Sequence, residues 1–390
     1  MKKCKILILL VLSLLICLFT VGCSDSVGAD DYDWEPEVSV SLEFDLYIIT
    51  DSDQSEASLS AMKTVNSKIN QYIDDKYGTI VNIHYLSADN YDETVRSLAQ
   101  NTTSTSEKEA TSSVRQHGGN IILINSESLH NDLVSSGKLV DLKPFLDSKS
   151  FGSLNIQLTS SLIEAAYVSD SEGTYLYCIP NDHPIGHYEF TIINRSVAEG
   201  ILNFSAQTEL REMHIIHGVA NDSAEELIAM INANLDLIGV TSVDEVIRSE
   251  VGDFADKAYY EANGYICNIT AYPEATAEEA LSSAFGILHS SDIYQNGKLL
   301  ISSDECEERA MEIIYAINAD KTVRNLLQYG VEHTHYTLDD NGCVVPSENN
   351  AYIMNIKYTG DMFNTLYSST WTQQMAENGE NQNKDSYTSK

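Results

Sequence analysis

The sequence has few basic residues for its length. Its 390 residues include 23 lysines and arginines against 58 aspartates and glutamates, which gives a formal net charge of -35. Nucleic-acid binding requires a basic face that tracks phosphates, so this excess of carboxylates argues against a nucleic-acid partner. It also disfavours adsorption of the protein body to anionic lipid headgroups. Hydrophobic residues still make up 43% of the chain, which together with its length predicts a sizeable core and two domains.

The sequence also lacks the motifs of common enzymes. It contains no G-x-S-x-G, no H-E-x-x-H and no glycine-rich phosphate loop before a helix. We therefore expect no cofactor and no catalytic residue, although a hydrolase stays an alternative because two glycosidase carboxylates need only meet in space. His183 and His187 could bind a metal, but Pro184 between them prevents a helix that would align them. No metal site is predicted.

The N-terminus has the pattern of a secretion signal. Lys2, Lys3 and Lys5 precede an apolar run over 6–19 that is too short for a membrane span of about 20 residues. The sequence 18–23, LFTVGC, resembles a bacterial lipobox, although threonine stands at position 20 where leucine is usual. The resemblance implies that residues 1–22 are a lipoprotein signal peptide. Cys23 would then carry the acyl chains that anchor the protein to the extracytoplasmic face of the cell membrane.

Residues 23–43 are acidic and contain no base, which predicts a solvated tether between the lipid and the folded protein. Four cysteines remain beyond the tether: Cys178, Cys267, Cys306 and Cys343. A disulfide is chemically possible outside the cell, but the wide spacing identifies no pair, and buried free thiols are the favoured interpretation.

Hydrophobic periodicity predicts an α/β protein. Apolar runs predict strands over 44–50, 81–85 and 120–125, with helices over 59–78 and 91–100 between them. This alternation is typical of a parallel sheet. The later predictions are helices over 154–166, 223–237, 242–260 and 303–328, strands over 174–180, 188–194, 265–271 and 284–288, a turn at 339–342, and a polar end from residue 373 that frays.

Three segments resemble the bacterial extracellular solute-binding proteins, the receptor lipoproteins of ABC importers. They are 120–146 with GKLVDL, 177–194 with YCIP and a return strand, and 308–338 with YGVE and HYTL, and Tyr358-Thr359-Gly360-Asp361 follows later. Their order is similar to the sugar-type branch, in which a glycine commonly stands where this chain has His333. With only two tryptophans, at positions 34 and 371, any stacking on a sugar would fall to the 22 tyrosines.

The resemblance implies a two-lobed, periplasmic-binding-protein-like fold with a hinge and an interlobe cleft. We assign 44–147 plus 284–305 to lobe 1, 148–283 plus 306–372 to a helix-rich lobe 2, and 373–390 to a flexible tail. The implied function is a membrane-anchored receptor that delivers a small solute, a carbohydrate, to an ABC permease. Alternatives are a receptor for a peptide, polyamine or metal ion, a surface-anchored hydrolase, and an adhesion or sensory lipoprotein.

In doubly wound sheets, ligands bind beyond the carboxyl ends of the strands. The predicted ligand-binding residues therefore follow strand ends: Asp51, Ser52, Asn125, Ser126, Glu127, Asn181, Asp182, Tyr188 and Tyr272. An ordinary loop in which the asparagine and aspartate stabilise turns is an equally good interpretation of 181–187.

Overall fold

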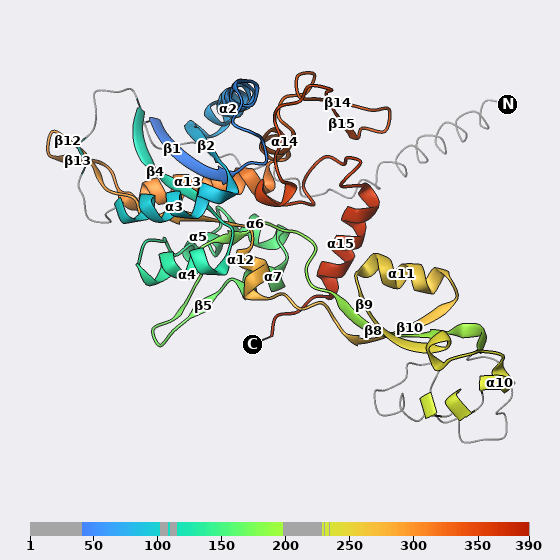
Figure 1. Ribbon diagram of the computed structural model, residues 1–390. Coiled ribbons are helices and arrows are strands. Elements are labelled where there is room, and N and C mark those ends of the chain that lie inside the picture. The colour runs from blue at the N-terminus through green and yellow to red at the C-terminus, as the bar shows by residue number, and fades with distance from the viewer. Residues whose placement is uncertain are drawn as a thin grey trace, which may run out of the picture. The chain divides into compact units, whose positions relative to one another are not determined.

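The computed structural model describes residues 41–101, 108–109, 115–197, 228–229, 231–233 and 235–389 (Figure 1). They belong to one compact unit, Val38–Lys390. The predicted signal peptide, Cys23, most of the predicted tether and the first five residues of the helix predicted over 223–237 lie outside the described residues. Within them, no helix has the length and apolar character that a membrane crossing requires.

A five-stranded sheet forms the centre of the fold, in the order β2-β1-β4-β11-β7. β1 pairs in parallel with β2 and β4, whereas β11 runs antiparallel to β4 and β7. The bounds are β1 Ser41–Ile49, β2 Thr79–Leu86, β4 Arg115–Ile124, β7 Ile179–Pro180 and β11 Ala284–Leu288. The predicted parallel strands are confirmed, but β1 begins at Ser41, within the segment assigned to the tether.

The helices of this first part form where the apolar spacing predicts them. α2, Glu56–Tyr77, begins at Ser55, whose side chain accepts from the amide of Ser58, and ends at Gly78, whose φ of 62° suits glycine. Its buried face consists of Ser58, Met62, Val65, Ile69 and Ile73. α3 (Ala88–Asn101) and α4 (Glu127–Ser135) complete the alternation of strand and helix.

The single helix predicted over 154–166 is wrong. The chain instead forms α6, Gly152–Gln157, and α7, Ser160–Ala165, after the short α5, Lys143–Leu146. The helix breaks because the amide of Thr159 donates to the Asp182 carboxylate, at 2.9 Å, rather than to a helical carbonyl. The strand predicted over 174–180 is regular only at its ends, in β6 (Thr174–Tyr175, paired with β5, Val168–Ser169) and β7.

A second, antiparallel sheet has the order β10-β8-β9, and α11 packs on it (Figure 1). The bounds are β8 Tyr188–Asn194, β9 Ile247–Gly252, β10 Tyr265–Ala271 and α11 Phe254–Ala262. The helix predicted over 242–260 is wrong, because Ile247–Gly252 pairs with β8 as a strand. Asp253 then caps the start of α11 through a reciprocal capping box with Asp256. The short helix α10 (Leu235–Ile238) and the 3-10 turn η3 (Val243–Glu245) precede β9 in the chain.

The C-terminal third completes the fold. The long helix predicted over 303–328 is two helices, α13 (Ser303–Ala319) and α14 (Lys321–Tyr329). The second begins anew because the Asp320 side chain accepts from the amides of Thr322 and Val323 and caps it. α13 packs on β4 and β11. The lobe boundaries stay predictions. The bounds are α12 Ala277–Leu281, β3 Lys108–Glu109, β12 Ile293–Gln295, β13 Lys298–Ile301, α13 Ser303–Ala319, α14 Lys321–Tyr329, β14 Tyr336–Leu338, β15 Val344–Pro346 and η4 Ile356–Tyr358. The predicted turn at 339–342 joins β14 and β15.

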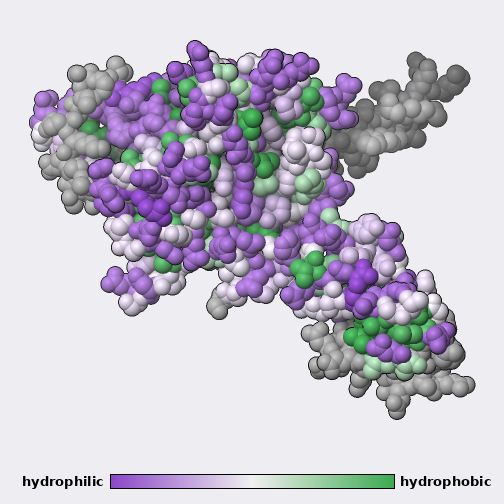
Figure 2. Space-filling view, viewed as in Figure 1, coloured by the Kyte–Doolittle hydropathy of each residue, from purple (hydrophilic) through white to green (hydrophobic). Residues whose placement is uncertain are grey.

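The predicted flexible tail is also wrong for most of its length, because Gln373–Asp385 forms helix α15. Its buried face carries Ala376, Gly379, Gln382 and Asn383, which are small or polar. In Figure 2 the visible face of the molecule is largely hydrophilic, in agreement with the acidic composition.

Candidate functional site

The strand ends from which we predicted a ligand site do share one edge of the central sheet. Ala284 of β11 pairs with both Ile124 and Pro180, which places the ends of β4 and β7 on either side of β11, and β1 runs parallel to β4. Asp51, Ser52, Asn125, Ser126, Glu127, Asn181 and Asp182 follow these ends. The sheet topology thus brings seven of the nine predicted residues to one edge.

Most of the polar groups at this edge bond to the protein itself. Ser52 exchanges hydrogen bonds with the backbone of Ile353, accepting from its amide at 2.7 Å and donating to its carbonyl at 3.1 Å. Asn125 donates to Asp92 at 3.0 Å, Ser126 caps α4, and Asn181 donates to the Ser283 hydroxyl at 2.9 Å. Their role in binding stays a prediction.

The predicted residues differ in how far they are exposed. Asp51 and Glu127 are exposed, and Tyr272 is half-exposed. The Tyr188 ring is fully buried, 6.4 Å from that of Tyr272, and its hydroxyl donates to Asp385 at 2.9 Å. Only Asp182 lines the pocket described next.

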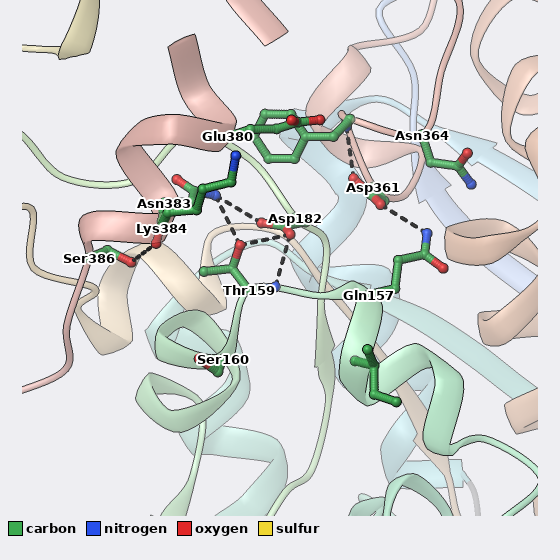
Figure 3. A pocket seen from close by; sticks show the side chains of 12 residues that line it. Gln157, Thr159, Ser160, Asp182, Asp361, Asn364, Glu380, Asn383, Lys384 and Ser386 are labelled. Atoms are coloured by element: carbon green, nitrogen blue, oxygen red, sulfur yellow. Dashed lines mark hydrogen bonds between the residues drawn. The ribbon is translucent and has the colours of Figure 1, made fainter. Parts of the chain in front are cut away.

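A pocket of about 570 Å³ lies between the α6–α7 break, the loop after β7, the loop after η4 and α15 (Figure 3). Its lining combines carboxyl, amide and hydroxyl groups and one lysine amino group with two apolar side chains. The lining residues are Ile156, Gln157, Thr159, Ser160, Asp182, Asp361, Phe363, Asn364, Glu380, Asn383, Lys384 and Ser386.

Asp182 forms one wall of the pocket and is 4% exposed. One carboxylate oxygen accepts from the amide and the hydroxyl of Thr159, both at 2.9 Å, and the other accepts from the Asn383 side-chain amide at 3.1 Å. These three donors orient the carboxylate, and two of them come from Thr159, at the break between α6 and α7.

Asp361 forms another wall and is 3% exposed. Its carboxylate accepts from the amide of Phe363 at 2.8 Å and from Gln157 at 3.2 Å (Figure 3). Its backbone carbonyl accepts from the fully buried Arg324 at 2.8 Å, and that guanidinium also donates to the Thr359 hydroxyl and the Ile356 carbonyl. Arg324 therefore fixes the loop that carries Asp361.

Burial raises the pKa of both carboxyl groups, and the charge of Asp361 raises the pKa of Asp182 further. A carboxyl group that retains a proton can donate a hydrogen bond, whereas a carboxylate accepts several. Two such groups beside amides and hydroxyls suit a ligand that carries many hydroxyl groups. Ile156, which is 87% exposed, and Phe363 supply apolar surface at the same pocket.

The sequence analysis missed most of this lining. Asp361 lies in the Tyr358–Asp361 motif, which was noted only as part of the resemblance, and four residues of the lining lie in the segment assigned to a tail.

His183, which was weighed as a metal ligand, is buried, and that burial lowers its pKa to about 4. Its ring lies 2.8 Å from the Asn181 carbonyl oxygen. Within the described ranges, no group of three or more histidine, cysteine or acidic side chains could hold a metal ion. Cys178, Cys267, Cys306 and Cys343 are thiols rather than members of disulfides.

No protein-family model and no curated protein sequence matches the chain. Solved structures do match it, and they show the two-lobed α/β fold of bacterial solute-binding proteins. One is the N-glycan transport solute binding protein (NgtS) from Streptococcus pneumoniae in complex with Man1GlcNAc, with a TM-score of 0.50 and 15% identity over 89% of this chain and 84% of that one. A second structure of NgtS gives a TM-score of 0.51 and 13% identity over 90% and 84% of the two chains. The predicted fold class is therefore confirmed.

Proposed function

We propose that the chain is an extracytoplasmic receptor that binds a carbohydrate and delivers it to an ABC importer. The observation that carries this proposal is the fold, which is shared with NgtS over nearly the whole chain. NgtS is an N-glycan transport protein, and one of its structures holds a mannose–N-acetylglucosamine ligand. We further propose that the chain binds its ligand without converting it.

The pocket supports a neutral, hydroxyl-rich ligand. Asp182, Asp361 and Gln157 can each pair with ligand hydroxyls through atoms held by protein hydrogen bonds. The lining holds three carboxyl groups, Asp182, Asp361 and Glu380, against one cation, Lys384. An anionic sugar would add a further negative charge beside this excess of carboxyl groups, and like charges repel. We therefore propose that neutral sugars bind in preference to uronic acids or sugar phosphates.

A thermal-shift screen tests the proposal. The panel contains neutral mono- and oligosaccharides, uronic acids, peptides, polyamines and divalent metals. A ligand at 100 times its Kd adds about 2.7 kcal/mol to the free energy of unfolding, enough for a clear rise in Tm. Stabilisation by a neutral sugar supports the proposal, whereas stabilisation by a peptide, polyamine or metal alone would replace the carbohydrate with that class.

Two variants tie the ligand to the pocket. Gln157→Ala removes a lining amide and is expected to weaken sugar binding. Gln295→Ala, at an exposed residue of β12 outside the pocket, should leave sugar binding unchanged. Equal affinities for both variants would place the ligand elsewhere. Product analysis of the stabilising sugar distinguishes a receptor from a surface-anchored hydrolase, because turnover would contradict the binding-only proposal.

We also propose that Cys23 carries the lipid anchor. This rests on the lipobox-like sequence 18–23 and the basic, apolar stretch before it. Cys23→Ala should block processing or release the protein from the membrane fraction. Unchanged partitioning of the variant, compared with Cys343→Ala as a control, would refute the anchor.

A further inference from the structure

Helix α15 contacts two different functional parts of the molecule. One is the pocket, where Glu380, Asn383, Lys384 and Ser386 form part of the lining (Figure 3). The other is the pair of chain segments that cross between the central sheet and the second sheet. Residues 181–187 lead from β7 to β8, and residues 272–276 return from β10 to α12.

The two crossing segments lie against each other. A Cβ atom on Gly186 would come within 2.9 Å of the amide nitrogen of Glu274 and 3.1 Å of the Cα of Pro273. Gly186 also has a φ of 59°, which side chains disfavour. A change in the relative orientation of the two sheets therefore requires the chain to move at this close contact.

α15 and the residues after it bind both crossings. Gln382 donates to the carbonyls of Ile185 and Gly186 at 2.7 and 2.6 Å. Tyr387 pairs with the returning segment, accepting from the amide of Ala275 at 2.8 Å and donating its amide to the carbonyl of Pro273 at 3.0 Å. The C-terminal segment is thus a brace across the crossings.

Asn383 belongs to both sets of contacts. Its side-chain amide donates to the Asp182 carboxylate and the Thr159 hydroxyl, both at 3.1 Å, and to the His183 carbonyl at 2.8 Å. Its carbonyl oxygen accepts from the amide of Ile185 at 3.1 Å. The side chain is only 7% exposed, so these protein groups are its main partners.

We propose that Asn383 is a positioning residue that joins the pocket to the crossing segments, so that the geometry of Asp182 and the conformation of residues 183–188 change together. Within the proposed function, on which this inference rests, sugar contact with Asp182 would thereby be transmitted to the orientation of the two sheets. Asn383 would set how tightly occupancy and orientation are coupled.

Hydrogen exchange of the ligand-free protein tests this coupling. Gln382→Glu removes the donors to residues 185 and 186 but keeps the acceptor for the amide of Phe254, and Gln382 does not line the pocket. We expect exchange to become about three- to tenfold faster at the amides of residues 183 and 185–188 and also at the Thr159 amide, which reports on Asp182. Gln374→Ala, on the exposed face of α15, should change neither, and β1 amides serve as the reference for global unfolding.

A double-mutant cycle distinguishes positioning from a merely structural role. If Asn383 transmits the effect, Gln382→Glu should no longer alter exchange at Thr159 in an Asn383→Ala background. The proposal is overturned if Gln382→Glu affects only residues 183–188, or if the two substitutions act additively at Thr159. Because no sugar is added, this result is independent of the ligand screen, and either proposal can fail while the other stands.

Discussion

Gly379 is the position where the docking of α15 can be tested most directly. A Cβ atom there would lie 2.7 Å from the Cγ atom of Pro184 and 2.9 Å from the Cε1 atom of Phe363. Carbon atoms normally pack at about 3.5–4.0 Å, so Gly379→Ala requires the helix or the two rings to move. Since Phe363 lines the pocket, such a movement would also change the pocket.

Two opposing effects set the magnitude. Replacement of glycine by alanine inside a helix is favourable by about 1 kcal/mol, whereas overpacking a close contact costs about 1–3 kcal/mol. Because both contacts fall below 3.0 Å, we expect a cost in the upper part of that range. The expected net result for Gly379→Ala is then a loss of about 1–2 kcal/mol, or a Tm lower by roughly 1–2 °C per kcal/mol for a unit of this size. The same substitution at Gly152, in α6, meets no atom within 4 Å and is the matched control. Gly152→Ala should raise stability by about 0.5 kcal/mol.

Differential scanning calorimetry of the two variants and the wild type gives the comparison. Gly379→Ala should melt below the wild type and Gly152→Ala at or slightly above it. If Gly379→Ala melts at or above the wild type, α15 does not rest on Pro184 and Phe363 as described, and the brace across the crossings loses its support. A sugar that binds the pocket should also bind Gly379→Ala more weakly than Gly152→Ala.

Three other predictions follow from single groups. Burial raises the pKa of Asp182 and Asp361 above the ordinary value of 3.8. Above about pH 4 the folded protein therefore binds more protons than the unfolded chain, and the contribution of these two groups to stability falls as the pH rises. Urea unfolding from pH 4 to 8 should show a flatter decline for Asp361→Asn than for the wild type; an unchanged slope would contradict the cause. Arg324→Met leaves buried carbonyls without donors and should lower the free energy of unfolding by about 3–5 kcal/mol. The control Arg248→Met, in the partly exposed pair with Glu250, should lower it by less than about 1 kcal/mol. Similar losses for the two variants would show that the buried bonds contribute little. Asp253→Ala removes the cap of α11 and should cost about 1 kcal/mol by chemical denaturation, unless another acceptor replaces it.

The first part of the fold was predictable because each of its elements has one strong signal. The apolar face of α2 repeats at helical spacing, and the run over 120–125 is fully apolar except at its ends. β9 carried no such signal, since its alternating residues lie beside helix-forming ones and only pairing with β8 makes them a strand. A local sequence pattern determines the secondary structure of a segment only where pairing with another strand does not decide between helix and strand.

The pocket was less predictable, because its residues meet through long-range contacts. Gln157 and Asp361 are 204 positions apart in the chain, and Asn383 and Asp182 are 201 apart. Asp182 was found because it follows a strand that ends at the edge of the sheet. Asp361 follows a 3-10 turn and has no strand to indicate its place. The general rule for ligand sites at strand ends therefore found one wall of the pocket and missed the other.

Helix α15 is polar for a structural reason that its sequence alone does not reveal. Residues 183–186 cross between sheets, so their carbonyl and amide groups lack the partners that a strand provides, and buried backbone groups require others. Gln382 and Asn383 provide those partners at the carbonyls of His183, Ile185 and Gly186 and at the amide of Ile185. An apolar stripe on α15 would leave these groups unpaired. A helix that docks on exposed backbone must be polar on its buried face, and it therefore has the composition of a disordered tail.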